Sequence, residues 1–391
     1  MMTTFTDRVT HLEAEGAYAV LARAQELERQ GREILHLELG QPDFSTPENI
    51  KEKGMQAIRD NRTRYTAPSG IHHFRELIAE FAGKQRGINV TPDMVVVGPG
   101  SKPGLFFPTM ALVQPGDEVI YPDPGFPTYS AMIGVAGGVG VPIPLSEENQ
   151  FSFDLDVFDR KISDKTKLIV LNSPANPTGG VIPLDDLKHI AEKVQKHNAW
   201  VLADEIYSRL VYDGMGTAPS IASIDGMLER TIIADGFSKT FAMPGWRLGY
   251  AIAPPKLAER LDLLVTHSVG STAEFTQYAG MEALTGPQDF IGEMLFEYQT
   301  RRDRLVEMLN AIPGVHARKP QGAFYVFPNI KLFGIPSKEI QRRLLEEAGV
   351  AVLAGTDFGA GGSGYLRFAY ATSMDVIERA MQKVTSFFSR F

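Results

Sequence analysis

The feature of this sequence that most constrains its fold is the alternation of short apolar runs with helical patterns. Runs rich in Val, Ile and Leu lie at 94–97, 118–121, 167–172, 200–204 and 231–235. Between the third and fourth runs, Leu184, Leu187, Ile190 and Val194 fall on one face of a predicted helix. Strands that alternate with helices predict an α/β protein with a mainly parallel sheet.

The C-terminal part of the chain follows a different pattern. Residues 291–312 form the longest helical pattern. After it come short strands such as 323–327, a helix near 337–348, a strand pair around 350–369 and a final helix, which indicates a smaller α+β unit. Between the last strands, residues 355–364 contain five glycines in ten positions, which predicts a mobile loop.

Composition excludes several classes of protein. The 391 residues predict two or three domains, and 39 basic against 47 acidic residues give a net charge of −8. This balance argues against a nucleic-acid partner, because phosphate binding needs a positive field. The chain has no cysteine, which excludes disulfides, cysteine-ligated metals and thiol catalysis. Charged residues interrupt the N-terminus and no apolar run reaches 18 residues, so we expect a cytoplasmic protein with no membrane partner.

Several familiar catalytic motifs are missing from the sequence. The eight histidines lack metal-ligand spacing, so we expect no metal site, and neither GxSxG nor SxxK occurs. The stretch GPGSKPG at 98–104 follows a predicted strand and precedes a predicted helix, which is the setting of a phosphate-binding turn. Its GxGxxxG spacing matches neither dinucleotide nor Walker motifs. It therefore indicates an anion site at a helix start or, equally, a simple turn.

Polar and aromatic side chains follow the predicted strands at the points where the strands end. In chain order these residues are Gly100, Ser101, Phe126, Asn172, Asn176, Asp204 and Lys239. The carboxyl ends of parallel strands share the edge at which α/β sheets bind ligands, so these groups should form one site. Pyridoxal phosphate needs a lysine amine, a carboxylate opposite its ring nitrogen, donors at its hydroxyl and a phosphate cup. The sequence offers a residue for each need.

Six motifs carry a resemblance to a known family. NSPANPTGG at 172–180, ADEIY at 203–207 and DGFSKTFAMPGWRLGY at 235–250 resemble class I aminotransferases of fold type I, in the subgroup of prokaryotic aspartate and aromatic aminotransferases. The similarity continues through 40–47, 64–71 and 365–372, in the family's order.

The resemblance implies a fold and an activity. It implies a large three-layer α/β/α domain at 46–285 that binds pyridoxal 5'-phosphate, and a small α+β domain formed by 1–45 plus 286–391. It also implies an aminotransferase that moves the α-amino group of an L-amino acid to a 2-oxo acid in two half-reactions, and a homodimer with shared active sites.

The resemblance further implies roles for single residues at the cofactor ring. Lys239 becomes the Schiff-base lysine and then the base that moves the substrate proton. Asp204 keeps the ring nitrogen protonated. Tyr207 and Asn176 donate to the ring hydroxyl, and Phe126 stacks on the ring.

The resemblance assigns the remaining residues to the phosphate and the substrate. The phosphate ligands are Gly100, Ser101, Lys102, Ser238 and Arg247, with Tyr65 reaching the cofactor of the neighbouring subunit. The substrate's α-carboxylate is held by Arg367, with Gly40 and Asn176 beside it.

Each of these residues also has an ordinary structural explanation. A lone lysine such as Lys239 is nearly always a solvated surface charge. Asp204 would equally cap a helix over the following segment, and Asn176 would equally be an Asn-Pro turn residue. Tyr207 and Phe126 would equally be core aromatic residues.

The distal part of the substrate pocket is the least constrained. We expect residues 15–18 and 267–275 to contact the substrate side chain, and neither segment contains an arginine, which argues against a strictly dicarboxylate enzyme. Tyr18 and Phe275 suit an apolar or aromatic side chain, and Glu15 suits a basic one. The same residues would equally serve as core packing and a helix cap.

Three other functions compete with transamination. A lyase or decarboxylase that uses pyridoxal phosphate on the same fold is the nearest. An aminotransferase-like regulator would need a basic DNA-binding domain, for which the acidic chain leaves too little room before residue 40. A nicotinamide-dependent oxidoreductase is disfavoured by the glycine spacing at 98–104.

Overall fold

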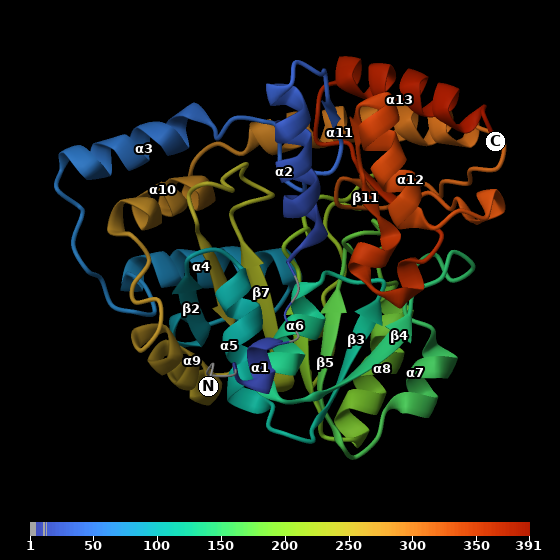
Figure 1. The fold of residues 1–391 in the computed structure, drawn as a ribbon. Coiled ribbons are helices and arrows are strands. Elements are labelled where there is room, and N and C mark those ends of the chain that lie inside the picture. Colours follow the sequence, from blue (N-terminus) through green and yellow to red (C-terminus); the bar gives the residue numbers. More distant parts are fainter. Residues whose placement is uncertain (1–4, 11, 13) are drawn as a thin grey trace, which may run out of the picture.

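A seven-stranded sheet forms the centre of the computed structural model, which describes residues 5–10, 12 and 14–391 (Figure 1). The strand order is β2-β8-β7-β6-β5-β3-β4. In that order the strands are Val95–Gly98, Gly249–Ile252, Thr231–Gly236, Trp200–Asp204, Thr166–Asn172, Glu118–Asp123 and Val139–Pro144. Only β8 is antiparallel to its neighbours, so six of these strands end at the same edge.

The five predicted strands are confirmed to within two residues at either end. The strand β4 follows helix α6 (Thr128–Ala136). The strand β8 was not predicted from an apolar run, because it has four residues, begins with a glycine and lies inside a longer loop motif. The apolar runs therefore predicted five of the six parallel strands, but neither the parallel β4 nor the antiparallel β8.

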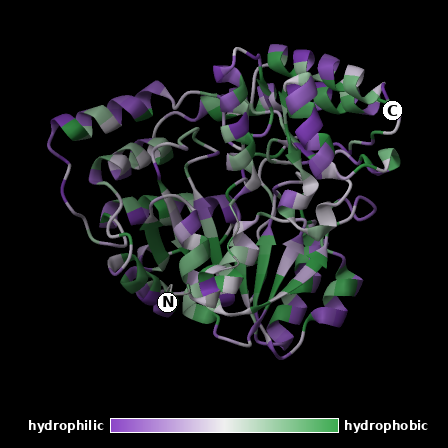
Figure 2. Cartoon of the chain, in the orientation of Figure 1, coloured by the Kyte–Doolittle hydropathy of each residue, from purple (hydrophilic) through white to green (hydrophobic). Residues whose placement is uncertain are grey.

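Helices cover both faces of the sheet because successive strand residues point to opposite sides. On one face, Val96, Leu168 and Ile232 pack with α6, α5 (Lys102–Leu112) and α9 (Pro255–Thr266). On the other face, Ile169 and Val201 pack with α7 (Leu155–Lys161) and α8 (Leu184–Lys196), and Val95 packs with α4 (His72–Arg86). Figure 2 shows hydrophobic strands between helices of mixed hydropathy. The predicted three-layer α/β/α arrangement is confirmed.

The C-terminal part forms the expected α+β unit. Its antiparallel sheet has the order β11-β12-β9, formed by Leu353–Ala354, Leu366–Ala369 and Tyr325–Val326. The surrounding helices are α11 (Asp289–Asn310), α12 (Ser337–Arg343), a π-helical turn at Leu344–Ala348, and α13 (Met374–Phe388). Two further helices, α3 (Glu48–Arg59) and α10 (Glu274–Thr285), pack against each other beside the main sheet.

The N-terminal segment joins this C-terminal unit. The strand β1 (Leu35–His36) pairs in parallel with β10 (Val350–Ala351). Helix α2 (Gly16–Arg29) contacts β10 and β11, and in Figure 1 its blue ribbon lies with the orange and red elements above the sheet. A short helix, α1 (Asp7–Thr10), precedes it. The pairing agrees with a small domain made from both ends of the chain, and the boundaries at 45 and 285 stay predictions.

The glycine-rich segment 355–364 contacts the edge of the main sheet. It forms two 3₁₀ turns, Gly355–Phe358 and Ala360–Gly362. The amide of Gly361 donates to Asp123 Oδ1 at 2.9 Å, and the amide of Gly125 donates to the Phe358 carbonyl at 2.8 Å. The segment therefore connects the C-terminal unit to the end of β3, and its mobility stays a prediction. Within the described residues, no helix is long and apolar enough to cross a membrane.

Two helical glycines test how tightly the sheet and its helices pack. A methyl group on buried Gly280 of α10 would lie 2.5 Å from Leu248 Cδ2 and 2.6 Å from Phe74 Cζ. We expect Gly280→Ala to lower the free energy of unfolding by about 1–3 kcal/mol through overpacking. Gly292→Ala in α11 is the control, since no atom lies within 4 Å of its added carbon. It should stabilise the protein by up to about 1 kcal/mol. Urea unfolding measures both, and equal effects would contradict this account of the packing.

Candidate active site

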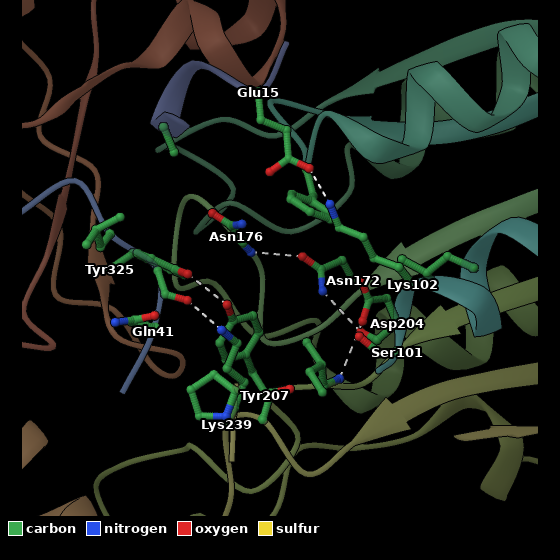
Figure 3. Close-up of a pocket in the computed structure, with 18 of the residues that line it drawn as sticks. Glu15, Gln41, Ser101, Lys102, Asn172, Asn176, Asp204, Tyr207, Lys239 and Tyr325 are labelled. Carbon is green, nitrogen blue, oxygen red and sulfur yellow. Dashed lines mark hydrogen bonds and ion pairs between the residues drawn. The ribbon is translucent and has the colours of Figure 1, made fainter. Parts of the chain in front are cut away.

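A cavity of about 550 Å³ opens at the sheet edge where the parallel strands end. Side chains from distant parts of the sequence converge on it (Figure 3). The predicted site residues that line it are Glu15, Tyr18, Gly40, Ser101, Lys102, Phe126, Asn172, Asn176, Asp204, Tyr207, Ser238, Lys239, Arg247 and Arg367. The predicted convergence at one edge is thus observed.

Lys239 follows β7 and projects its amine into this cavity. Its Nζ donates a hydrogen bond to the carbonyl of Gly40 and lies 5.8 Å from the ring centroid of Tyr207. The pKa of Lys239 is lowered to about 8. Burial is the main cause, and the positive charges of Arg367 and Arg247 contribute to the same shift. This lysine is therefore not a solvated surface charge, and its amine is readily available as a free base.

Asp204 is the buried carboxylate at the end of β6. Its Oδ2 accepts a hydrogen bond from the Tyr129 hydroxyl at 2.7 Å, and its Oδ1 accepts a long one from the amide of Ile206 at 3.4 Å. Burial raises the pKa of Asp204 to about 6, and the Tyr129 hydrogen bond opposes this rise. The segment that follows forms turns instead of the helix that Asp204 would cap. A cationic partner in the cavity would offset the cost of burying this carboxylate.

A positively charged turn lies at the N-terminus of α5. The helix begins at Lys102, directly after Ser101, and Gly100 has a positive φ of 92°. The Arg247 guanidinium lies against this turn, where Nη2 donates to the Pro99 carbonyl at 3.2 Å. A Cβ on Gly100 would collide with that guanidinium. A helix start with an adjacent arginine is a favourable site for a phosphate group.

Arg367 is a buried cation with neutral partners. Arg367 is 3% exposed. Its Nη1 donates to Asn176 Oδ1 at 3.0 Å, and its Nη2 donates to the Glu38 carbonyl. The guanidinium lies 4.4 Å from the ring centroid of Tyr325. Among the described residues, Nε of Arg367 has no hydrogen-bond partner. The guanidinium therefore retains capacity for an anionic ligand.

Three predicted residues have surroundings that the sequence did not define. Tyr65 is 98% exposed and does not line the cavity of this chain, so its expected contact with a neighbouring subunit stays a prediction. Phe275 lies outside that cavity and lines a separate one of about 670 Å³ beside Arg247, so its predicted contact with the substrate side chain stays a prediction. The carboxylate of Glu15 pairs with the Lys102 ammonium, so it does not offer an unpaired charge to a basic substrate.

Two tyrosines at the site were missed by the sequence analysis. Tyr129 lies three residues after Phe126 in the first turn of α6, so helical spacing could have brought it to attention. Tyr325 comes from β9, and its hydroxyl lies 2.7 Å from that of Tyr207. No local pattern links two residues that are 118 positions apart.

Comparison with known proteins identifies the family. A model of the family described as "Aminotransferase class I and II" matches residues 32–384. This chain belongs to that family. The aminotransferase is 38% identical to an asparagine–oxo-acid transaminase of Streptococcus mutans over the full length of both chains.

Two solved structures show how closely the fold is shared. The aspartate aminotransferase of Thermus thermophilus with maleate superposes with a TM-score of 0.94 at 37% identity, covering 98% of this chain and all of the other. The aromatic aminotransferase of Pyrococcus horikoshii superposes with a TM-score of 0.89 at 38% identity, covering 95% of this chain and 99% of the other.

These relationships confirm the predicted family, activity and cofactor. The protein is an aminotransferase of EC class 2.6.1 that acts on amino acid and oxo acid substrates and uses pyridoxal phosphate. They favour transamination over the lyase or decarboxylase that the sequence analysis left open. The cavity fits this cofactor, since it holds a half-buried lysine, a buried carboxylate without a cationic hydrogen-bond partner in the described residues, and an arginine at a helix start.

The lowered pKa of Lys239 is directly measurable in the cofactor-free aminotransferase. The pKa in the folded protein lies below the ordinary lysine value of 10.5, so the free-base fraction should grow as the pH rises through about 8. We expect the rate of reductive methylation at Lys239, followed by peptide mass spectrometry, to have its midpoint there. Arg367→Gln should move the midpoint upwards, because the Arg367 charge lowers this pKa. A midpoint near 10.5 in the unaltered protein would show that the amine is effectively solvated.

Proposed function

We propose that the aminotransferase attaches its cofactor covalently to Lys239 and moves the substrate proton with the same amine. The observation that carries this proposal is the juxtaposition, at one sheet edge, of a half-buried lysine of lowered pKa with the buried carboxylate of Asp204. Pyridoxal phosphate, when bound, supplies an electron sink for the charge that develops at the substrate's α-carbon. Because its pKa is lowered to about 8, Lys239 has a larger free-base fraction near neutral pH than a solvated lysine, and in that form it accepts the α-proton and returns it at the adjacent position.

The other cavity residues hold the cofactor in this proposal. Asp204, which is buried, keeps the ring nitrogen protonated. Asn176 and Tyr207 donate to the ring hydroxyl, and Phe126 covers one ring face. The phosphate ligands are Gly100, Ser101, Lys102, Ser238 and Arg247. The exposed position of Arg247 against the α5 turn supports its part in this set.

Arg367 binds the substrate's α-carboxylate in this proposal. Its bonds go to neutral acceptors and its Nε is unpartnered among the described residues, so the cation is left for a carboxylate. Bidentate pairing would fix the α-carbon relative to Lys239. The backbone of Gly40, which already accepts from Lys239, lies on the same side of the cavity.

The distal pocket suits neutral and aromatic side chains in addition to acidic ones. Glu15 and Lys102 neutralise each other at the cavity wall, and Tyr18 offers an aromatic surface. Neither charge is left unpaired to select one class of substrate. Steady-state kinetics across single L-amino acids test this proposal, and a preference for aspartate above all other donors would contradict it.

We also propose that the aminotransferase is a cytoplasmic homodimer in which Tyr65 completes the neighbouring site. Tyr65 is almost fully exposed, and an open cavity lined by Phe44, Trp246 and Phe275 lies beside Arg247. These features suit an interface between two copies of the chain. The proposed domains are 46–285 and 1–45 plus 286–391. Trp246 and Phe275 belong to the large domain, and Phe44 lies in the small domain next to the boundary between them.

The dimer proposal predicts a mass and a cofactor effect. Light scattering after gel filtration should give twice the chain mass of 43.0 kDa. Tyr65→Phe should leave this mass unchanged and weaken cofactor binding by roughly ten- to a hundredfold, because a hydrogen bond to a charged group is worth about 1.5–3 kcal/mol. A monomer, or a Tyr65→Phe dimer with normal cofactor affinity, would rule out the shared site.

The absorption spectrum of the purified protein tests the proposed role of Lys239. The protein with pyridoxal phosphate should show a visible band that bleaches with certain L-amino acids and returns with a 2-oxo acid. Lys239→Ala should lose the covalently bound chromophore after borohydride reduction and lose transamination by several orders of magnitude. Lys256→Ala, a helical lysine outside the residues that line the cavity, is the matched control and should behave as the unaltered protein. Covalent attachment that survives Lys239→Ala would reject the assignment.

A further inference from the structure

A buried ionic cluster lies directly behind the chain segments that carry Asp204 and Lys239. Arg86, the last residue of α4, donates from Nε to Glu205 Oε2 and from Nη2 to Asp235 Oδ2, both at 2.6 Å. The three side chains are at most 7% exposed. None of the three lines the 550 Å³ cavity. The cluster therefore has no direct contact with ligands in the cavity.

The cluster is fully hydrogen-bonded and unbalanced in charge. Glu205 Oε1 accepts from the Ser220 hydroxyl at 2.6 Å. Asp235 accepts from the Tyr250 hydroxyl at 3.1 Å and from the amide of Gly236 at 2.7 Å. One guanidinium thus pairs directly with two carboxylates, while the charge of Arg209 also acts on Asp235 from a longer distance. Burying such charges costs several kcal/mol per ion and rarely stabilises a fold more than apolar packing would. Fold stability alone is a weak explanation for its presence.

The positions of the two carboxylates along the chain suggest another purpose. Glu205 directly follows Asp204, and Asp235 precedes Lys239 by four residues. In the β6–β7 register, Asp204 lies opposite Ala234, and the amide of Glu205 donates to the Ala234 carbonyl at 2.9 Å. A single guanidinium therefore bonds to both chain segments that supply the chemistry of the cavity.

We infer that Arg86 is a positioning residue for transamination, which holds the segment of Asp204 against the segment of Lys239 and balances the charges of Glu205 and Asp235 behind them. This inference rests on the proposed roles of Asp204 and Lys239. The electrostatics support it, because the charges of Asp235 and Glu205 add to the effect of burial in raising the pKa of Asp204. Removal of Arg86 leaves those two charges without the cation that pairs with them directly, and only the more distant Arg209 still acts on Asp235.

The other ionisable groups near the two residues come from different elements. Asp204 faces Tyr129 of α6, and Lys239 faces Arg247, Arg367 and the Tyr207 ring. Substitutions at Arg86 or Glu205 leave all of these in place. A change in the titration of the cofactor band can then be assigned to the cluster.

The experiment is a pH titration of the visible band of the intact holoenzyme, in variants of opposite charge change. Arg86→Gln removes a positive charge, so it should favour the protonated, cationic form of the link to Lys239 and raise the midpoint by about half a unit to one unit. Glu205→Gln removes a negative charge at nearly constant shape and should lower the midpoint. Arg86→Lys restores the charge and should return the midpoint towards that of the unaltered enzyme.

A surface variant and a fixed set of outcomes make the test decisive. Arg342→Gln breaks an exposed ion pair with Glu339 and should leave the midpoint unchanged. Unshifted midpoints, or shifts of the same sign, in Arg86→Gln and Glu205→Gln would overturn the inference and leave the cluster a purely structural one. If Arg86→Gln does not fold, the sign of the Glu205→Gln shift decides alone. An unaltered protein without a visible band would overturn the proposed role of Lys239 itself.

Discussion

The site of this aminotransferase depends on the common direction of six strands in its central sheet. The strands β2, β7, β6, β5, β3 and β4 all end at one edge. The pairing of the strands therefore brings residues such as Ser101 and Lys239 together, without direct contacts between their side chains. The strand β8 is antiparallel to both β7 and β2, so β2 runs in the same direction as the other five strands. The backbone hydrogen bonds of the sheet thus determine where the proposed cofactor site lies, and the side chains determine what it binds.

The strand-end residues were predictable from the sequence because their position follows from a local pattern. Asp204 and Lys239 each follow a run of apolar residues whose direction the alternation with helices implies. The order of the strands was not predictable in this way, and neither was β8, whose four residues give no periodic signal. Local patterns therefore predicted the edge at which the cavity and the proposed site lie, but they did not predict which strands are neighbours in the sheet.

The contacts that support the site residues could not be predicted from the sequence, for a physical reason. Tyr325, Glu38 and Arg86 meet their partners only after the N-terminal segment, the C-terminal sheet and α4 have packed onto the strands. A tyrosine in a short strand and an arginine at a helix end have the most ordinary sequence surroundings. The family motifs indicated Arg367, but its neutral partners, Asn176 Oδ1 and the Glu38 carbonyl, emerge only from the tertiary contacts.

Two buried arginines show how the partners of a charge decide its use. Arg86 forms ion pairs with two carboxylates, so its charge is neutralised within the protein and needs no ligand. Arg367 is equally buried, yet it bonds to an amide oxygen and a backbone carbonyl, and its Nε is unpartnered among the described residues. A buried cation without a counter-ion is costly, and that cost is relieved when an anion binds. The same type of side chain therefore bridges two chain segments in one place and, in the proposed function, binds the substrate's carboxylate in the other.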